Sequence, residues 1–204
     1  MALNLIYMLW YEEEIQRLET QHTALTYKPD TLFYGSSSIR QWTGLADHFE
    51  SLKPVNLGFG GSTLAACAWF FNRVTRGYQP DRIIVYAGDN DLADGRHPQE
   101  VAISFEYLAK RVKERYSQVP CYFISLKPST ARWGLIDQFR YTNELIATDI
   151  ENNHPNWNWV DIFKPMLNSN GKPDSDYFIA DGLHLNEKGY QLWSSILHNA
   201  LDLK

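Results

Sequence analysis

The sequence predicts one three-layer α/β/α domain, in which helices cover both faces of a parallel β-sheet. Its length of 204 residues is that of a single ordinary domain. Its hydrophobic fraction of 44% and charged fraction of 21% are typical of a globular protein. Short apolar runs alternate with segments whose apolar residues recur every three or four positions, and this alternation favours parallel strands connected by helices.

The first half of the chain predicts two helices and two strands. In order, these are a helix with Tyr11, Ile15, Leu18 and His22 on one face, strands at 31–34 and 54–57, and a helix over 64–74. The helix at the start precedes the first strand instead of connecting two strands. We therefore expect a single domain over residues 1–204, with residues 1–30 as an N-terminal helical extension.

The second half continues the alternation. The predicted elements are a strand at 82–87, a helix that begins near Pro98, a strand at 121–125, a helix over 136–150, a strand at 157–162 and a final helix. Pro98 suits the first turn of a helix, where its missing N–H costs nothing. Asn186 can cap the final helix. We expect the buried face of that helix to hold Trp193, Ile196, Leu197 and Ala200.

Charge and cysteine content limit the possible partners. The formal net charge is −5 and the 19 Lys and Arg residues are scattered, which argues against a nucleic-acid partner. Cys67 and Cys121 lie in apolar stretches and are expected to be buried thiols. The start of the chain lacks the basic and small-residue signals of an export peptide, and no apolar run could span a membrane. We therefore expect a cytoplasmic protein.

Polar residues gather where the predicted strands end. In open α/β sheets, ligands bind beyond the carboxyl ends of the strands, so chemistry is expected there. The polar stretches are 35–40 (Gly-Ser-Ser-Ser-Ile-Arg), 58–63 (Gly-Phe-Gly-Gly-Ser-Thr), 88–91 (Gly-Asp-Asn-Asp) and 181–184 (Asp-Gly-Leu-His), the last of them just before the final helix.

Asp181 and His184 have a spacing that suits an acid–base pair. A serine hydroxyl needs a neighbouring base to become a nucleophile, and a histidine base needs a carboxylate to hold its tautomer. Three residues apart in a turn, with Gly182 relaxing the backbone, the carboxylate can accept the imidazole Nδ1–H and leave Nε2 facing a serine. An isolated Asp-x-x-His is more often a surface turn, so the motif decides little by itself.

Asn90 and the glycine loop could supply hydrogen-bond donors. A side-chain amide and a backbone N–H aimed at a developing oxyanion each contribute a few kcal/mol to an acyl-transfer transition state. Asn90 and the Gly61 N–H, joined by the Ser37 N–H, would form such an oxyanion hole. The glycines could instead cradle a phosphate. Their spacing argues against a dinucleotide site, because Thr63 replaces the third small residue and Asp81 precedes the next strand instead of following it.

Taken together and in this order, the four stretches resemble the conserved blocks of the SGNH hydrolase superfamily, the GDSL-type esterases and lipases. The resemblance runs from about residue 31 to the C-terminus, and it implies a flavodoxin-like, five-stranded parallel sheet. It also implies that Ser37 is the nucleophile, with Asp181 and His184 as its acid and base. The oxyanion hole would consist of Ser37, Gly61 and Asn90. Such chemistry needs no metal and no cofactor.

The first block departs from the usual pattern. It has G-S-S-S-I-R in place of G-D-S-L, as in a bacterial subgroup, so Ser36 occupies the position of the usual aspartate. Position favours Ser37, while Ser36 and Ser38 stay as competing assignments for the nucleophile. The α/β-hydrolase fold is a separate possibility for a serine esterase, but Ile39 stands where its G-x-S-x-G motif needs a second glycine.

The resemblance implies a serine esterase that hydrolyses a short-chain or acetyl ester through an acyl-enzyme on Ser37. The substrate could be an acetylated carbohydrate, a lipid or a thioester, and the oligomeric state is open. Arg40, Lys127 and Arg132 could face an anionic substrate group or be paired within the fold. The alternatives are a catalytically silent module that binds a ligand or carbohydrate, and a flavin- or nucleotide-binding protein, against which the glycine spacing argues.

Overall fold

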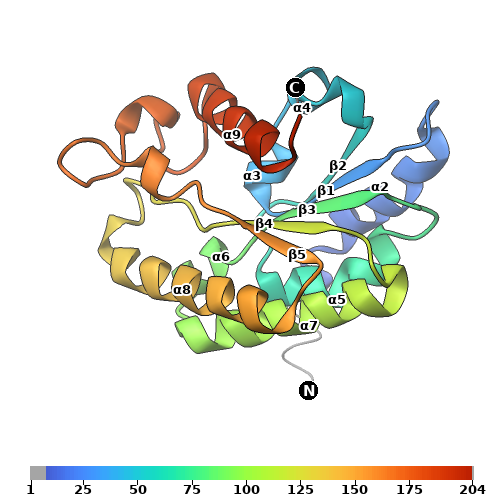
Figure 1. Cartoon of the computed structure of the whole chain (residues 1–204), viewed down its shortest axis with the longest axis horizontal. Helices are drawn as coiled ribbons and strands as arrows, with labels where there is room; N and C mark the ends of the chain where they lie inside the picture. The colour runs from blue at the N-terminus through green and yellow to red at the C-terminus, as the bar shows by residue number, and fades with distance from the viewer. Residues whose placement is uncertain (1–7, 204) are drawn as a thin grey trace.

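A five-stranded sheet forms the centre of the computed structural model, which describes residues 8–203 (Figure 1). The strand order is β2-β1-β3-β4-β5 and every neighbouring pair is parallel. The strands are β1 (Thr31–Gly35), β2 (Pro54–Gly58), β3 (Arg82–Tyr86), β4 (Cys121–Ile124) and β5 (Trp157–Val160). The predicted parallel α/β sheet is confirmed.

Helices cover both faces of this sheet (Figure 1). One layer contains α2 (Glu12–Ala24), α5 (Leu64–Val74), α7 (Pro98–Tyr116) and α8 (Ile136–Asn153). The other contains α3 (Ser37–Arg40), α4 (Leu45–His48) and α9 (Glu187–Ala200). Short elements complete the described chain: α6 (Asp89–Ala93) after β3 and the 3-10 turns η1 (Glu50–Leu52), η2 (Trp133–Leu135), η3 (Lys164–Met166) and η4 (Ser175–Tyr177).

Alternate side chains of each strand point to opposite faces of the sheet and so supply two cores. In β1, Tyr34 packs against Phe71 of α5, whereas its neighbour Phe33 packs against Trp42 on the other face. All five residues of β1 are buried, as expected of a central strand covered on both sides. Trp42 is therefore a core residue, stacked on Tyr190 of α9, and is not available to a ligand.

Helix α2 packs into the first of these cores. Ile15 and Leu18 are fully buried and belong to the same apolar cluster as α5. Arg73 of α5 also forms ion pairs with Glu12 and Glu19 of α2, at 2.7 and 2.9 Å. The N-terminal extension predicted over residues 1–30 thus contains a helix that packs against the sheet layer, while residues 1–7 lie outside the described residues.

The fourth and fifth strands end earlier than the sequence pattern predicts, at Ile124 and Val160. Beyond these positions a side chain takes over from the backbone as acceptor. The Ser125 Oγ accepts hydrogen bonds from the amides of Ile162 and Phe163, at 2.9 and 3.1 Å. The amides that follow β5 are therefore hydrogen-bonded although the strand has ended. The residues that follow β4 form a loop.

Helix α9 begins as predicted, but its buried face differs. The Asn186 side chain accepts a hydrogen bond from the Gly189 amide at 3.1 Å and caps the helix. Trp193 and Leu197 are buried as predicted, together with Tyr190, which the prediction omitted. Ala200 is exposed, so its predicted core position is wrong. The apolar face continues instead through Leu201, which packs against the same cluster at the helix cap.

The remaining sequence predictions that the fold tests concern cysteines and membrane spans. Cys67 and Cys121 are buried, unpaired thiols, as predicted. Burial raises the pKa of Cys121 to about 12, because the thiolate would lose its hydration. Within residues 8–203, no helix combines the length and the apolar character required to cross a bilayer.

Candidate active site

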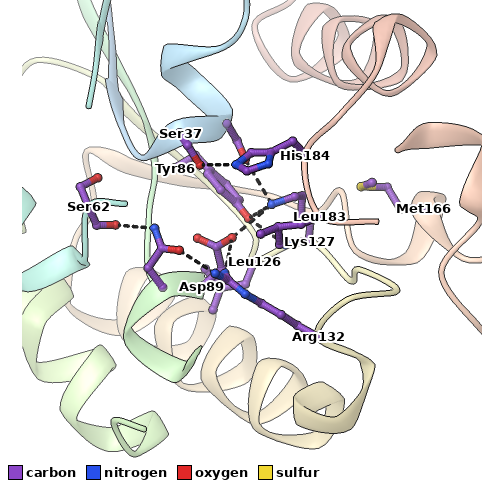
Figure 2. Close-up of polar contacts among 12 residues, drawn as sticks. Ser37, Ser62, Tyr86, Asp89, Leu126, Lys127, Arg132, Met166, Leu183 and His184 are labelled. Carbon is purple, nitrogen blue, oxygen red and sulfur yellow. Dashed lines mark hydrogen bonds and ion pairs between the residues drawn. The ribbon is translucent and has the colours of Figure 1, made fainter. Parts of the chain in front are cut away.

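The polar stretches predicted from the sequence meet at the carboxyl end of the sheet. Figure 2 shows Ser37, Asp89, Lys127, Arg132 and His184 converging there, although they come from distant parts of the chain. Ser37 follows β1, Asp89 follows β3 and Lys127 follows β4, whereas His184 precedes α9. Because parallel strands end at the same edge of the sheet, their following residues are brought together.

A tight turn after β1 places Ser37 at the start of α3. Gly35 has φ +142°, and any side chain there would collide with the Tyr86 carbonyl of the neighbouring strand. That carbonyl instead accepts a hydrogen bond from the Ser36 amide at 2.9 Å. Ser37 is then the first residue of a helical turn, where a backbone N–H has no intrahelical acceptor. The turn therefore presents both the Ser37 hydroxyl and its N–H.

The three consecutive serines have different surroundings. The Ser37 Oγ lies 3.1 Å from the His184 Nε2. Figure 2 draws this contact as a dashed line. Ser36 is fully buried. Ser38 is also buried, and its Oγ accepts a hydrogen bond from the Lys127 Nζ at 3.1 Å. Of the three hydroxyls, that of Ser37 is therefore the one in contact with a histidine.

Asp181 and His184 form the pair that their spacing predicts. The Asp181 Oδ2 lies 2.6 Å from the His184 Nδ1. The other carboxylate oxygen accepts hydrogen bonds from the amides of Leu183 and His184, at 2.8 and 2.9 Å. One carboxylate thus holds the turn and also fixes the orientation of the imidazole ring, which leaves the Nε2 facing Ser37.

These hydrogen bonds control the ionisation of Asp181. Its partial burial raises the pKa, but the bonds from the His184 side chain and from the His184 and Leu183 amides outweigh that effect and hold the pKa at about 2. Asp181 is consequently a carboxylate at neutral pH. An ionised acceptor at Nδ1 favours the tautomer in which the His184 Nε2 can take a proton.

The loop after β4 supports the Asp181–His184 turn. Gly182 adopts φ +64°, and a side chain there would collide with Thr130. Its carbonyl accepts hydrogen bonds from the Thr130 hydroxyl at 3.0 Å and from the Ala131 amide at 3.1 Å. The sequence analysis did not identify Thr130 or Ala131, because nothing in their local sequence indicates a partner about fifty residues away.

The glycine loop after β2 is held from two sides. Gly61 has φ +67°, and its carbonyl accepts a hydrogen bond from the Tyr11 hydroxyl at 3.0 Å. Asp91 accepts a hydrogen bond from the Leu64 amide, at the start of α5, at 2.8 Å. Burial raises the pKa of Asp91 to about 7. The segment just before α2 and the helix after β3 therefore both fix the backbone that carries the Gly61 N–H.

Asn90 faces the glycine loop. Its Nδ2 donates to the Ser62 carbonyl at 3.0 Å, and its Oδ1 accepts from Arg132 at 2.8 Å. A side-chain amide has two N–H donors, so one remains for a further acceptor. The structure therefore places Asn90 beside the residue that follows Gly61, as the predicted donor set requires.

A buried cluster of charges lies beneath the site (Figure 2). The Asp89 carboxylate is 3.1 Å from the Lys127 Nζ and 3.1 Å from an Arg132 nitrogen, and the Lys127 and Asp89 side chains are only 1% and 5% exposed. Burial raises the pKa of Asp89, but the two cations outweigh that effect and lower it. The Tyr86 hydroxyl also contacts the Lys127 Nζ, at 3.2 Å.

These contacts resolve the two roles that the sequence left open for the cations. Lys127 and Arg132 are paired with Asp89 inside the fold. Arg40 is paired with Glu14 at 3.0 Å. Structural pairing is therefore the role that the structure shows for all three.

Asn143 fixes the backbone next to Lys127. It is the polar residue in the otherwise apolar stripe of α8. Its Oδ1 accepts a hydrogen bond from the Leu126 amide at 2.8 Å, and its Nδ2 donates to the Leu126 carbonyl at 3.0 Å. A buried polar side chain in an apolar stripe requires partners. Both polar atoms of the Asn143 amide are thus satisfied by the backbone of Leu126, which fixes the start of the loop after β4.

Replacement of Asp89 with asparagine is expected to lower the free energy of unfolding by about 3–5 kcal/mol, the usual effect of removing one member of a buried ion pair. The loss arises because Lys127, at 1% exposure, and Arg132 would lose the carboxylate that offsets the cost of burying their charges. Urea unfolding at neutral pH measures the change.

Asp137→Asn provides a matched control. Asp137 pairs with Arg140 at the same distance of 3.1 Å, but its side chain is 91% exposed. Its replacement is expected to change the free energy of unfolding by less than about 0.5 kcal/mol. Equal losses in the two variants would contradict a special role for burial.

The described part of the chain contains no group of three or more His, Cys, Asp and Glu side chains placed to hold a metal ion. What the site does contain is a hydroxyl, a histidine and a carboxylate in line. Beside them lie an asparagine amide and backbone N–H groups. This set can activate an oxygen nucleophile and stabilise an oxyanion.

Comparison with known proteins gives a family match. The model of the GDSL-like lipase/acylhydrolase family matches residues 25–192. This range includes every strand of the sheet and all of the site residues except Tyr11 and Glu14. No curated protein matches the sequence significantly.

Solved structures share the fold at low sequence identity. A protein of Streptococcus pneumonia described as a candidate platelet activating factor is 22% identical, with a TM-score of 0.79 and 98% of both chains covered. A GDSL-like lipase from Bacteroides thetaiotaomicron is 19% identical, with a TM-score of 0.74 and coverage of 92% of this chain and 97% of that one. A member of the lipolytic G-D-S-L family from Veillonella parvula is 16% identical, with a TM-score of 0.71 and coverage of 84% and 97%.

Proposed function

The chain belongs to the GDSL-like lipase/acylhydrolase family, and from this premise we propose that it is a serine esterase acting on a short-chain or acetyl ester through an acyl-enzyme on Ser37. One observation carries the proposal. The Ser37 hydroxyl, the His184 imidazole and the Asp181 carboxylate form a continuous chain of contacts, at 3.1 and 2.6 Å. A hydroxyl aligned in this way with an oriented base is the requirement for nucleophilic catalysis by serine.

In the first step, the His184 Nε2 takes the proton of the Ser37 hydroxyl as the Oγ attacks the ester carbonyl carbon. The imidazolium that forms is stabilised by Asp181, whose carboxylate accepts the Nδ1–H. The imidazolium then gives its proton to the leaving alcohol oxygen as the carbon–oxygen bond breaks. The acyl group remains on Ser37. A water molecule, activated by the same histidine, releases it as the carboxylic acid in the second step.

The carbonyl oxygen becomes an oxyanion in both tetrahedral intermediates. We assign its stabilisation to the Ser37 and Gly61 N–H groups and to the second Nδ2–H of Asn90. Removal of one such donor typically costs about 10²–10³ in kcat. The geometry that supports this assignment is the fixed backbone around Gly61 and the hydrogen bond from Asn90 to the Ser62 carbonyl.

Two measurements test this function. The purified protein is expected to hydrolyse p-nitrophenyl acetate and to react with a fluorophosphonate probe, with the label found by mass spectrometry on Ser37. A series of nitrophenyl esters of increasing acyl length separates the substrates, because preference for the shortest chains supports an acetyl ester and excludes a lipase.

Other outcomes would reject the proposal. A label on Ser36 or Ser38 would move the nucleophile to another serine of the same turn. An absence of both turnover and labelling would reject the esterase, and measurable affinity for a carbohydrate or other ligand would then support a binding module of the same fold.

The proposal also covers the partner, the domain organisation and the cellular location of the protein. We propose a small-molecule ester as its partner and a single domain over residues 1–204 that includes helix α2. A cytoplasmic location is compatible with the two unpaired cysteines, Cys67 and Cys121. Fractionation of cells that produce the full chain tests the location.

A further inference from the structure

We propose that Arg132 is a positioning residue for oxyanion stabilisation, acting through Asn90. The inference rests on the proposed esterase function and assigns a role to a residue outside the acid–base–nucleophile set. Its basis is a pair of contacts: one Arg132 nitrogen donates to the Asn90 Oδ1 at 2.8 Å, while another lies 3.1 Å from the Asp89 carboxylate.

The first contact fixes which end of the Asn90 amide points where. Arginine is a donor only, so the atom it contacts must be the oxygen of the amide. The Nδ2 is thereby turned toward the Ser62 carbonyl, to which it donates at 3.0 Å. With one N–H used by Ser62, the other is directed by the planarity of the amide group. Arg132 thus helps to keep a donor, and not an oxygen, in the oxyanion hole.

The second contact fixes Arg132 itself. Asp89 is held in turn by Lys127, whose Nζ also donates to the Ser38 hydroxyl, at 3.1 Å in each case. A continuous chain of contacts, partly buried at Arg132 and fully buried at Lys127, therefore connects the Asn90 amide to the helix that begins at Ser37. Arginine suits the branching point of this chain, because one nitrogen of its planar fork donates to the Asn90 Oδ1 while another forms an ion pair with Asp89.

The same contact strengthens the amide as a donor. A cation hydrogen-bonded to the Oδ1 draws electron density from the amide, which makes the N–H groups of Asn90 better donors. This effect matters most when negative charge develops on the substrate oxygen. We therefore expect Arg132 to contribute to kcat more than to KM.

An alternative role for Arg132 is direct capture of an anionic substrate group. The structure argues against it. The Arg132 side chain is 16% exposed and already faces the carboxylate of Asp89. A substrate anion would have to compete with that buried partner. Direct capture predicts a rise in KM for an anionic ester, which distinguishes the two roles.

A double-mutant cycle on the full chain tests the proposal with p-nitrophenyl acetate as substrate. Arg132→Met is expected to lower kcat about 10-fold with little change in KM. Asn90→Ala is expected to lower kcat by about 10²–10³. If Arg132 acts through Asn90, the double variant has the kcat of Asn90→Ala alone, because the residue that Arg132 positions is already absent.

Two further variants separate positioning from folding. Arg132→Lys keeps a cation beside Asp89 but lacks the planar fork. It is therefore expected to recover the melting temperature that Arg132→Met loses relative to the wild type, without recovering kcat. It also replaces Arg132→Met in the cycle if the methionine variant does not fold. Arg140→Met is the matched control, since Arg140 is half-exposed and pairs with the exposed Asp137. It is expected to leave kcat unchanged.

The outcomes that overturn the proposal are distinct from those that overturn the esterase function. An active enzyme in which the effects of Arg132→Met and Asn90→Ala multiply would show that Arg132 acts independently of Asn90. A rise in KM at constant kcat for the anionic ester mono-p-nitrophenyl succinate, but not for neutral p-nitrophenyl acetate, would show that Arg132 binds substrate. A wild-type protein that neither turns over the ester nor reacts with the fluorophosphonate probe would reject both the function and the positioning role.

Discussion

Ser37→Ala is expected to lower kcat for p-nitrophenyl acetate by about 10⁴–10⁶, close to the rate left by the oxyanion donors alone. In the proposed mechanism, the substitution removes the oxygen that forms the acyl-enzyme. It leaves Asp181 and His184 with their mutual contact at 2.6 Å. The kinetics are measured with the active-site concentration determined by fluorophosphonate titration of the wild-type protein, and the variant is expected to show no labelling.

The neighbouring serines provide the controls for Ser37→Ala. Ser36→Ala removes a buried hydroxyl that the structure shows without a hydrogen-bond partner among the described residues, so it is expected to keep kcat within about 10-fold of the wild type. Ser38→Ala removes an acceptor of Lys127 and is expected to affect stability more than chemistry. Retained turnover in Ser37→Ala with loss in Ser36→Ala would reassign the nucleophile.

Hydrophobic periodicity predicted most of the fold, because long elements repeat their pattern several times. The five strands and the long helices α5, α7 and α8 each bury a face that the spacing of apolar residues indicates. Helices α3 and α6 were not predicted. Each has only four or five residues, which is less than two turns and too short for a periodic pattern. They are the turns on which Ser37 and Asn90 sit.

The order of polar stretches along the chain predicted which residues face the site, but not what holds them. Asp89, Lys127 and Arg132 pair because β3 and β4 end side by side, and no local pattern reports that a lysine after one strand contacts an aspartate after another. Tyr11 is a similar case. Its place in the sequence suggests one face of a helix, whereas its hydroxyl contacts the Gly61 carbonyl fifty positions away.

Asp181→Asn is expected to lower kcat by about 10⁴ while the fold of the turn is kept. The asparagine Oδ1 can still accept the Leu183 and His184 amides, which lie 2.8 and 2.9 Å from the carboxylate in the wild type. The other end of the side chain becomes an NH₂ group, which cannot accept the Nδ1–H of His184. The imidazole is then driven to the tautomer with its proton on Nε2, where it cannot act as a base toward Ser37.

The pKa of Asp181, which lies at about 2, also sets how the wild-type rate depends on pH. A lowered pKa means that the benefit of the charged carboxylate is present above that value and is lost only below it. On the acid side, the logarithm of wild-type kcat is therefore expected to fall with a slope of no more than one down to about pH 4, because the base titrates there and Asp181 does not. A slope approaching two between about pH 5 and 4 would contradict a permanently ionised Asp181.

Asp174→Asn is the matched control that separates the turn from the chemistry. Asp174 also caps a short turn, since its side chain accepts the Asp176 amide at 3.1 Å, but the residue that it holds carries no catalytic group. Its replacement by asparagine keeps the capping oxygen, as Asp181→Asn does. If loss of charge at a turn were enough to lower kcat, both variants would be impaired. We expect full activity in Asp174→Asn, because the contribution of Asp181 depends on the imidazole that its second oxygen contacts.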